Sequence, residues 1–354
     1  MEVRDFRNHT ETKLDAPEGI QALVGPNAQG KTNLLEAAHY LLTLRSTRVS
    51  SDQPLVRVGA ESAFLRGEVE TAAGRTLVEV EVRSSGANRI QVNRSGVRRK
   101  RDLRQRVRSV MFIPEDVAVI QGGPEDRRRF MDDAVESLWP VEEAARTAYD
   151  KALRQRNRLL KENEGPGAPA ELEAWDSELA SHGAAVTAAR RKALASVAPK
   201  AGDEFERVSG ERLRVEYRPS VDAEDDLEST MLKMLAERRE DELVRRTTLV
   251  GPHRDELDIA VGEMKARRFA SHGESLAGAL CLRLGIWGAV SAEIHESAVL
   301  LLDDPFSGLD PVRRKKLGDG LASRGQVLIS VPDRAQVPAG ASVWEVEGGR
   351  ASPE

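Results

Sequence analysis

The chain has 354 residues, of which 40% are hydrophobic and 31% charged, and its formal net charge is −5. This composition is typical of a globular protein with a real core, and the acidic balance excludes a uniformly basic nucleic-acid binder. The single cysteine, Cys281, excludes an intramolecular disulfide and a zinc site built from several cysteines.

The hydropathy pattern predicts no membrane segment. No apolar stretch approaches the roughly 18 to 20 residues that span a bilayer, and the first eight residues do not form the apolar core of a signal peptide. We therefore expect a cytoplasmic protein without a membrane partner.

Near the N-terminus, residues 25–32 follow the phosphate-loop pattern of Gly, four residues, then Gly-Lys-Thr. An apolar run at 20–24 precedes the loop and a helical pattern at 33–42 follows it, which argues against a chance glycine-rich turn. Backbone N–H groups would surround the phosphates, Lys31 would add a charge, and Thr32 would offer its hydroxyl to Mg²⁺. The predicted loop residues are Gly25, Pro26, Asn27, Ala28, Gln29, Gly30, Lys31 and Thr32.

The next part predicts an antiparallel β section, with strands at 76–82 and 89–92 joined by a turn at 84–86. Residues 83–108 contain ten Lys or Arg against one acid and no aromatic residue. Phosphate contact with duplex DNA is the expectation, and a solvated, salt-bridged face is the alternative. The predicted DNA contacts are Arg98, Arg99, Lys100, Arg101, Arg104 and Arg106.

A helical pattern begins near Pro124 and places apolar residues on one face as far as Leu159. After a Gly/Pro breaker at 163–169, a second pattern covers 172–197, so two antiparallel helices are expected. One more helix at 231–246 and strands at 247–250 and 257–261 should follow.

The C-terminal part predicts buried strands at 299–302, 326–331 and 342–346. Asp303 and Asp304 follow the first of these, at the strand end where ligands of α/β sheets gather. We assign Asp303 to Mg²⁺ and Asp304, together with Lys31, to catalysis, with Asp304 orienting or deprotonating a water. Two acids that merely cap a turn are the alternative.

Residues 271–275 open a long apolar helix, and Ser271 and Gly273 could bind a γ-phosphate at its N-terminus. Residues 307–310 (SGLD) follow the paired acids. Neither motif is specific alone. With the loop and the acidic strand, they resemble the ATP-binding-cassette class of ATPases, in which residues 271–275 would be the signature motif. In that class two ATPase domains, called heads, come together, and the signature of one head completes the nucleotide site of the other.

The long interval between loop and signature resembles the SMC-like ATPases, and several strings resemble the RecF family. These strings are 6–8 (FRN), 29–36 (QGKTNLLE), 112–117 (FIPEDV), 127–132 (RRRFMD) and 251–257 (GPHRDEL). The family usually has Gly at position 28 and Gln at position 274, where this chain has Ala28 and Glu274.

The resemblance implies an α/β fold with an ABC-type ATPase head made of residues 1–123, including the antiparallel β section, and 247–354. A helical, short coiled-coil-like domain would be inserted at 124–246. It also implies ATP and Mg²⁺ as cofactors, an ATP-dependent homodimer, and contact of Arg7 and Asn8 with the nucleotide. For Arg7 and Asn8, a hydrogen-bonding role at a strand end is equally compatible with the sequence.

The implied function is DNA repair at gaps, on duplex or gapped DNA, with slow ATP hydrolysis, in partnership with RecR and RecO and in support of RecA loading. One alternative is an ATP-gated adaptor that does not hydrolyse ATP. A diverged SMC-like ATPase of other DNA metabolism is another.

Overall fold

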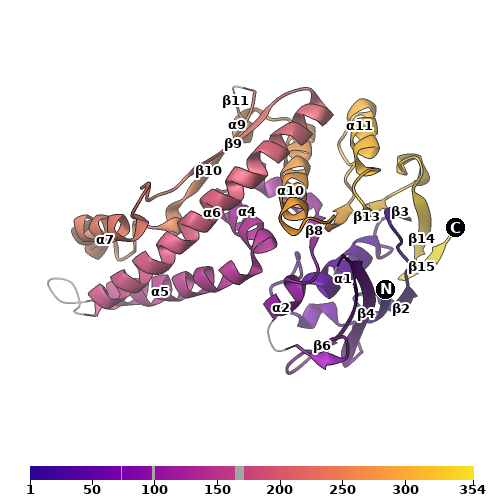
Figure 1. The fold of residues 1–354 in the computed structure, drawn as a ribbon, viewed down its shortest axis with the longest axis horizontal. Coiled ribbons are helices and arrows are strands. Elements are labelled where there is room, and N and C mark those ends of the chain that lie inside the picture. Colours follow the sequence, from indigo (N-terminus) through magenta and orange to yellow (C-terminus); the bar gives the residue numbers. More distant parts are fainter. Residues whose placement is uncertain (73, 98–99, 164–170, 263) are drawn as a thin grey trace. The chain divides into compact units, whose positions relative to one another are not determined.

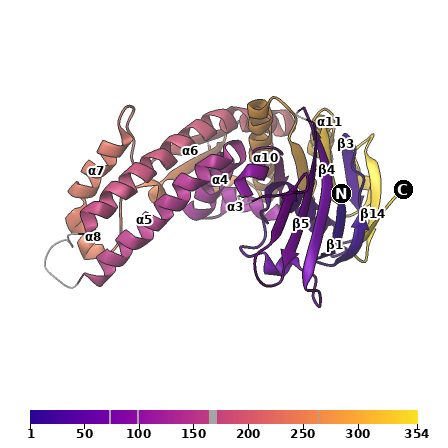
Figure 2. The ribbon, with the colours of Figure 1, turned by 60° about the horizontal axis from the view of Figure 1, so that its bottom comes forward.

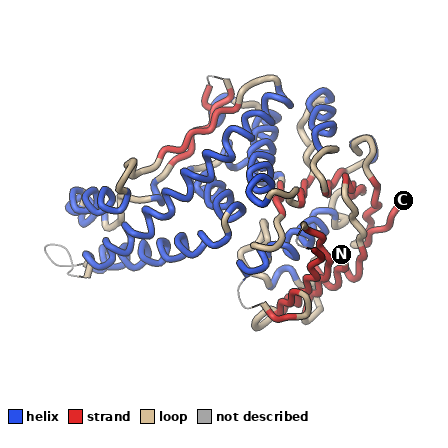
Figure 3. The backbone as a smooth tube through the Cα atoms, in the orientation of Figure 1, coloured by secondary structure: helices blue, strands red, loops and turns tan. Residues whose placement is uncertain are grey.

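The computed structural model describes residues 1–72, 74–97, 100–163, 171–262 and 264–354. The chain divides into two compact units, and each is described separately. The head unit comprises Met1–Val117, Lys200–Arg212 and Ala270–Glu354, and the helical unit comprises Ala118–Pro199 and Leu213–Phe269. Figure 3 shows mixed helices and strands in the head unit and mainly helices in the helical unit.

These units differ from the predicted domain boundaries. Residues 247–269, expected in the head, fall in the helical unit because β10 (Glu256–Val261) pairs along its length with β9 (Leu213–Arg218). Residues 200–212, expected in the inserted domain, fall in the head unit. The first boundary lies at residue 117 and not at 123.

One sheet of the head unit is antiparallel, and Figure 2 shows its strands β1, β4 and β5 side by side. In β5 the side chains of Thr76, Val78, Val80 and Val82 are buried while the residues between them face outward, as a two-residue period requires. In spatial order the described strands are β2 (His9–Lys13), β1 (Glu2–Phe6), β4 (Ser62–Thr71), β5 (Gly74–Arg83), β6 (Arg89–Val92) and β7 (Ser95–Gly96).

The second sheet of the head unit is parallel except for its edge strand β15 (Figure 1). Its central strands are mainly apolar because both faces are covered. The predicted strands at 299–302, 326–331 and 342–346 are confirmed. In spatial order the described strands are β15 (Arg350–Pro353), β14 (Ser342–Glu347), β3 (Gly19–Val24), β13 (Gln326–Val331), β12 (Val299–Asp303) and β8 (Ser109–Phe112).

Helix α1 (Lys31–Thr43) contacts both sheets and contributes to the core between them. Leu34 and Leu35, which share a face with Ala38 and Leu41, are fully buried there. The other described helices of the head unit are η1 (Gln53–Leu55), α2 (Lys100–Arg104), η2 (Pro114–Val117), α10 (His272–Ile294), α11 (Pro311–Leu321) and η5 (Arg334–Gln336).

Helix α10 corrects the hydropathy expectation. By length and composition it could cross a membrane, but 67% of its apolar window is buried inside the protein. It packs against β8 and η2 and is therefore a core helix, apolar on every side because it is covered.

In the helical unit, α5 (Glu143–Glu162) and α6 (Leu172–Ser209) hold a core with α7 (Leu227–Glu237). Residues 200–209 of α6 continue into the head unit. The remaining described elements are α3 (Ala118–Gln121), α4 (Pro124–Leu138), η3 (Pro140–Glu142), β9, α8 (Arg239–Arg245), η4 (Pro252–Arg254), β10, β11 (Met264–Lys265) and α9 (Ala266–Phe269).

Three predicted elements of the helical unit were wrong. The apolar face that starts near Pro124 is carried by two helices, because Pro140 interrupts the pattern after α4. The helix at 231–246 is also two helices, with a break at Arg238. No strand forms at 247–250, because the N–H groups of Thr248 and Leu249 donate to side chains of Asn157 and Glu242.

Candidate nucleotide site

The phosphate loop lies at the carboxyl end of β3, and α1 begins directly after it at Lys31. Strands β3, β13 and β12 are parallel neighbours, so their carboxyl ends meet at one edge of the sheet. This topology brings Asp303 to Thr32, although the two residues are 271 positions apart. The predicted pairing of the loop with the acidic strand is confirmed.

Asp303 accepts hydrogen bonds from two hydroxyls. The Thr32 Oγ1 lies 2.9 and 2.8 Å from its two carboxylate oxygens, and the Ser330 Oγ lies 2.5 Å from Oδ1. A hydroxyl and a carboxylate oxygen are the ligand types that Mg²⁺ takes next to a phosphate. The side chains of Thr32 and Asp303 therefore fit the predicted metal role.

Lys31 folds back over the loop. Its Nζ donates to the carbonyl oxygens of Gly25 at 2.5 Å and Pro26 at 2.8 Å. Burial lowers the pKa of Lys31, while Asp303 and Asp304 act to raise it. The ammonium is thus held at the mouth of the loop, where a phosphate oxygen can replace a carbonyl partner.

Asp304 is held in an uncommon backbone conformation, with φ 45°, and its N–H donates to the Ser330 Oγ at 2.9 Å. Among the described residues, its buried Oδ1 has no hydrogen-bond partner. Burial and the neighbouring Asp303 raise the pKa of Asp304. A half-buried carboxylate with a raised pKa and one oxygen that lacks a hydrogen-bond partner among the described residues can orient or deprotonate a water.

An open cavity of ≈ 490 Å³ covers this edge of the sheet. The residues that line it come from the β1–β2 turn, the phosphate loop, α1 and the segment after it, η2 and the ends of β12 and β13. They are Asn8, Asn27, Ala28, Gly30, Lys31, Thr32, Asn33, Arg48, Pro114, Asp303, Asp304, Ser330 and Pro332.

Five of the lining residues were not assigned to the site by the sequence analysis, among them Arg48 and Ser330. Arg48 donates to Asn33 Oδ1 at 2.9 Å, and Asn33 in turn donates to Asn8 Oδ1 at 2.8 Å. Ser330 binds both acids, as described above. Neither residue belongs to a local motif, because only the folded chain places Arg48 and the end of β13 at the loop.

Of the two N-terminal candidates, Asn8 lines the cavity and donates to the Gln29 carbonyl at 3.1 Å. Arg7 does not line it. Its guanidinium makes two 2.9 Å bonds to the fully buried carboxylate of Glu36 and a third to the Pro54 carbonyl. Contact of Arg7 with the nucleotide stays a prediction.

The signature residues do not line this cavity among the described residues. Ser271 caps α10, with its Oγ accepting from the Glu274 N–H while the Glu274 carboxylate accepts from the Ser271 N–H. These bonds lower the pKa of Glu274. Gly273 packs against the Gly308 carbonyl, which would lie 2.8 Å from an added Cβ.

The structure describes only some of the residues predicted to contact DNA. Arg98 and Arg99 lie outside the described residues, and Lys100 begins α2. Arg106 is exposed and Arg101 partly exposed, whereas Arg104 is buried at 6% exposure. Arg104 is therefore not presented to a DNA backbone in this conformation.

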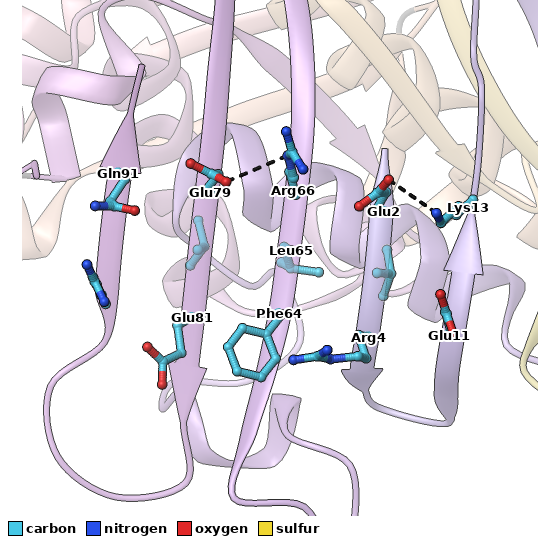
Figure 4. Close-up of a pocket in the computed structure, with 13 residues that line it drawn as sticks. Glu2, Arg4, Glu11, Lys13, Phe64, Leu65, Arg66, Glu79, Glu81 and Gln91 are labelled. Atoms are coloured by element: carbon cyan, nitrogen blue, oxygen red, sulfur yellow. Dashed lines mark ion pairs between the residues drawn. The ribbon is translucent and has the colours of Figure 1, made fainter. Parts of the chain in front are cut away.

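A second hollow, of ≈ 380 Å³, lies on the outer face of the antiparallel sheet (Figure 4). Its rim is charge-balanced, with ion pairs between Lys13 and Glu2 and between Arg66 and Glu79, and with Arg4 stacked 4.3 Å from the Phe64 ring centre. Such a mixed face does not offer the excess positive charge that a polyphosphate backbone requires.

The sequence matches the family model described as RecF/RecN/SMC N terminal domain over residues 1–348. A DNA replication and repair protein RecF from Streptomyces avermitilis is 42% identical over 96% of this chain and 94% of its own length. One from Cutibacterium acnes is 39% identical over 96% of this chain and 93% of its own.

Among solved structures, a recombination mediator protein RecF-ATPrS of the RecFOR pathway superposes with a TM-score of 0.89 at 30% identity, covering 99% of this chain and 96% of that one. An Smc head domain from Pyrococcus furiosus shares the fold alone, with a TM-score of 0.57 at 15% identity over 99% and 94% of the chains. The chain belongs to the RecF family of DNA replication and repair proteins, within the SMC-like ATPases.

Proposed function

We propose that the protein is an ATP-dependent DNA-binding protein of recombinational gap repair and replication restart, acting in the cytoplasm. It binds MgATP at the loop, dimerises on ATP, holds duplex DNA or a single-strand/duplex junction, and hydrolyses ATP slowly. RecR, with RecO, is its proposed partner, and RecA loading is the step it assists. The similar solved structures of RecF-ATPrS and RecF-ATP support ATP as the nucleotide.

One observation supports the proposed dimer. Lys31, Thr32, Asp303 and Asp304 line one cavity, whereas Ser271, at the start of α10 in the same unit, is not among its lining residues. Ser271 presents an exposed helix N-terminus, which is a site that favours an anion. The site is therefore proposed to be completed by Ser271 and Gly273 of a second copy.

A mixing experiment tests this arrangement. Lys31→Ala removes the charge in the loop and Ser271→Arg blocks the signature, so each variant alone should lack ATPase activity. A mixed dimer would contain one intact site, formed by the loop of the Ser271→Arg protomer and the signature of the Lys31→Ala protomer. Activity that returns on mixing supports the proposal, and mixtures as inactive as the single variants refute completion by a second copy.

DNA contact has its own test. ATPase activity and binding should be measured with duplex, single-stranded and gapped DNA over a range of salt concentrations, because phosphate contacts weaken steeply with salt. Arg106→Ala should weaken binding to all sequences about equally and reduce the salt slope by about 1. Glu68→Ala, on the antiparallel sheet, is a control that should leave both unchanged. Indifference to all three DNAs contradicts the proposal.

The second candidate is an adaptor that binds ATP without hydrolysing it. The raised pKa of Asp304 and the lack of a partner for its Oδ1 among the described residues favour hydrolysis over this alternative. Turnover that is absent in the wild type, with or without DNA, and is unchanged by Asp304→Asn would support the adaptor.

A further inference from the structure

His9, the first residue of β2, is fully buried beneath the phosphate loop. Its Nε2 lies 3.0 Å from the Gly30 carbonyl oxygen and its Nδ1 lies 3.0 Å from the Thr12 Oγ1. Because a carbonyl oxygen can only accept, the proton must be on Nε2. Burial lowers the pKa of His9, so the neutral imidazole, with Nδ1 accepting from the Thr12 hydroxyl, is the favoured form near neutral pH.

The carbonyl that His9 binds belongs to the peptide between Gly30 and Lys31. The same oxygen accepts from the Leu34 N–H at 2.9 Å, in the first turn of α1. In a trans peptide the C=O and the N–H point in opposite directions. Holding this carbonyl toward His9 and Leu34 therefore aims the Lys31 N–H away from the helix, toward the position of a phosphate.

The C-terminal hairpin supports the same loop from the other side. The Gly349 N–H donates to the Gln29 carbonyl at 3.0 Å, and the Gly348 N–H donates to Gln29 Oε1 at 2.8 Å. The Gly349 carbonyl oxygen lies 3.3 Å from the Thr12 Oγ1. A continuous set of polar contacts thus runs from the β14–β15 turn through Thr12 and His9 to Gly30.

The packing around these contacts leaves little room for adjustment. A Cβ on Gly30 would lie 2.8 Å from His9 Nε2 and from both amide atoms of Asn8. A Cβ on Gly349 would lie 2.3 Å from the Asn8 carbonyl oxygen. The position of the imidazole and the position of the Gly30 peptide are therefore set together.

We propose that His9 is a positioning residue for nucleotide binding, whose Nε2–H fixes the peptide between Gly30 and Lys31 in the orientation that binds phosphate. The single hydroxyl proton of Thr12 goes to Nδ1, the nearer of its two acceptors, so Thr12 holds the imidazole for this role. The inference rests on the proposed binding of ATP by this loop. His9 does not touch the nucleotide, in contrast to Lys31 and Thr32.

Two substitutions at His9 separate positioning from packing. His9→Leu fills the space without a donor, whereas His9→Gln retains an amide N–H that can reach the Gly30 carbonyl. By calorimetry with MgATP, His9→Leu should weaken affinity about tenfold, the loss of one buried hydrogen bond in a binding site. His9→Gln should recover most of that loss.

A matched control is Val80→Ala, which removes a buried side chain of β5 in the same sheet, away from the loop. It should lower the melting temperature without changing MgATP affinity. If His9→Leu does not fold, the MgATP affinities of Thr12→Val and Thr12→Ser can be compared instead, because only the serine can donate a hydrogen bond to Nδ1.

The outcomes distinguish failure of the proposed His9 role from failure of the proposed ATP binding by the loop. Wild-type affinity in His9→Leu, or in Thr12→Val if that pair is used, overturns the positioning role. A loss that the glutamine or serine variant does not recover overturns it as well. If the wild type itself binds no MgATP, or binds it as well as Lys31→Ala does, the proposed function of the loop fails instead.

Discussion

The Thr32 hydroxyl donates to the carboxylate of Asp303, with Oγ1 2.9 and 2.8 Å from its two oxygens. This contact joins the helix that follows the phosphate loop to a strand made 271 residues later. It also places together the two oxygen ligands assigned to Mg²⁺, and so makes the metal assignment testable.

Thr32→Ala should weaken MgATP binding about tenfold or more, because one protein oxygen is lost from the metal's surroundings. Thr32→Ser keeps the hydroxyl and should bind nearly as the wild type does. Calorimetry with MgATP, and with ATP in EDTA, measures the effect. An equal loss in the presence and absence of Mg²⁺ contradicts the metal role.

The phosphate loop contains an alanine in a left-handed conformation, Ala28, with φ 66°. This conformation costs an L-residue roughly 1 kcal/mol, so Ala28→Gly should raise the free energy of unfolding by about 0.5 kcal/mol after the added chain entropy is subtracted. Gly30→Ala should lower it by about 2 kcal/mol or more, since φ is 113° and the Cβ would meet Asn8 and His9. Urea unfolding of both variants checks the opposite signs.

Arg7 serves the fold through its ion pair with Glu36, whose side chain is fully buried. Arg7→Met should lower the free energy of unfolding by about 3 kcal/mol, because the buried carboxylate loses its bidentate partner and keeps Ser46 and a longer, 3.5 Å contact with Arg48. A double-mutant cycle with Glu36→Gln, followed by urea unfolding, measures the coupling. Unchanged stability with weakened ATP binding would favour direct contact with the nucleotide.

Gly273 has a packing role in addition to its proposed phosphate role. Gly273→Ala should lower the free energy of unfolding by about 1 to 3 kcal/mol, because the methyl group would press on the Gly308 carbonyl. Gly96→Ala is the matched control, since nothing lies within 4 Å of its added Cβ. If the two variants melt alike, the close contact does not constrain position 273.

His253 predicts a pH dependence of stability in the helical unit. Burial lowers the pKa of His253 from 6.5 to about 4, while its ring bonds Tyr149 and the Thr248 carbonyl. Between those values the unfolded state binds more protons, so this residue makes stability fall as the pH falls from 6.5 toward 4. The difference in unfolding free energy between wild type and His253→Gln, measured from pH 7 to pH 4.5, should change in that direction. A constant difference contradicts the prediction.

The parts of the fold that were predictable depend on local patterns. The phosphate loop follows a fixed spacing, and the strands at Val299–Asp303 and Gln326–Val331 are mainly apolar, as burial on both faces of a sheet requires. The strand at Ser342–Glu347 instead alternates buried and exposed residues. The pairing of loop and acidic strand followed from their places at strand ends.

Other features depend on neighbours that are distant in sequence. Residues 247–250 resemble a strand, yet the side chains of Asn157 and Glu242 satisfy two of their N–H groups. Strand β9 does alternate apolar and charged residues, so a local pattern for it was present, and it pairs with β10 along its length. Arg48, Ser330 and the imidazole of His9 enter the site only through tertiary contacts, which no local spacing reveals.

Strand β3, which leads into the phosphate loop, pairs with β13 and β14 on its two sides. Both partners lie roughly 300 residues later in the chain. While a ribosome is still making the protein, β3 is complete but has neither neighbour in its sheet. Nucleotide binding therefore has to wait until β13 and β14 have been made, and truncated products that stop before Gln326 should expose this apolar strand and aggregate.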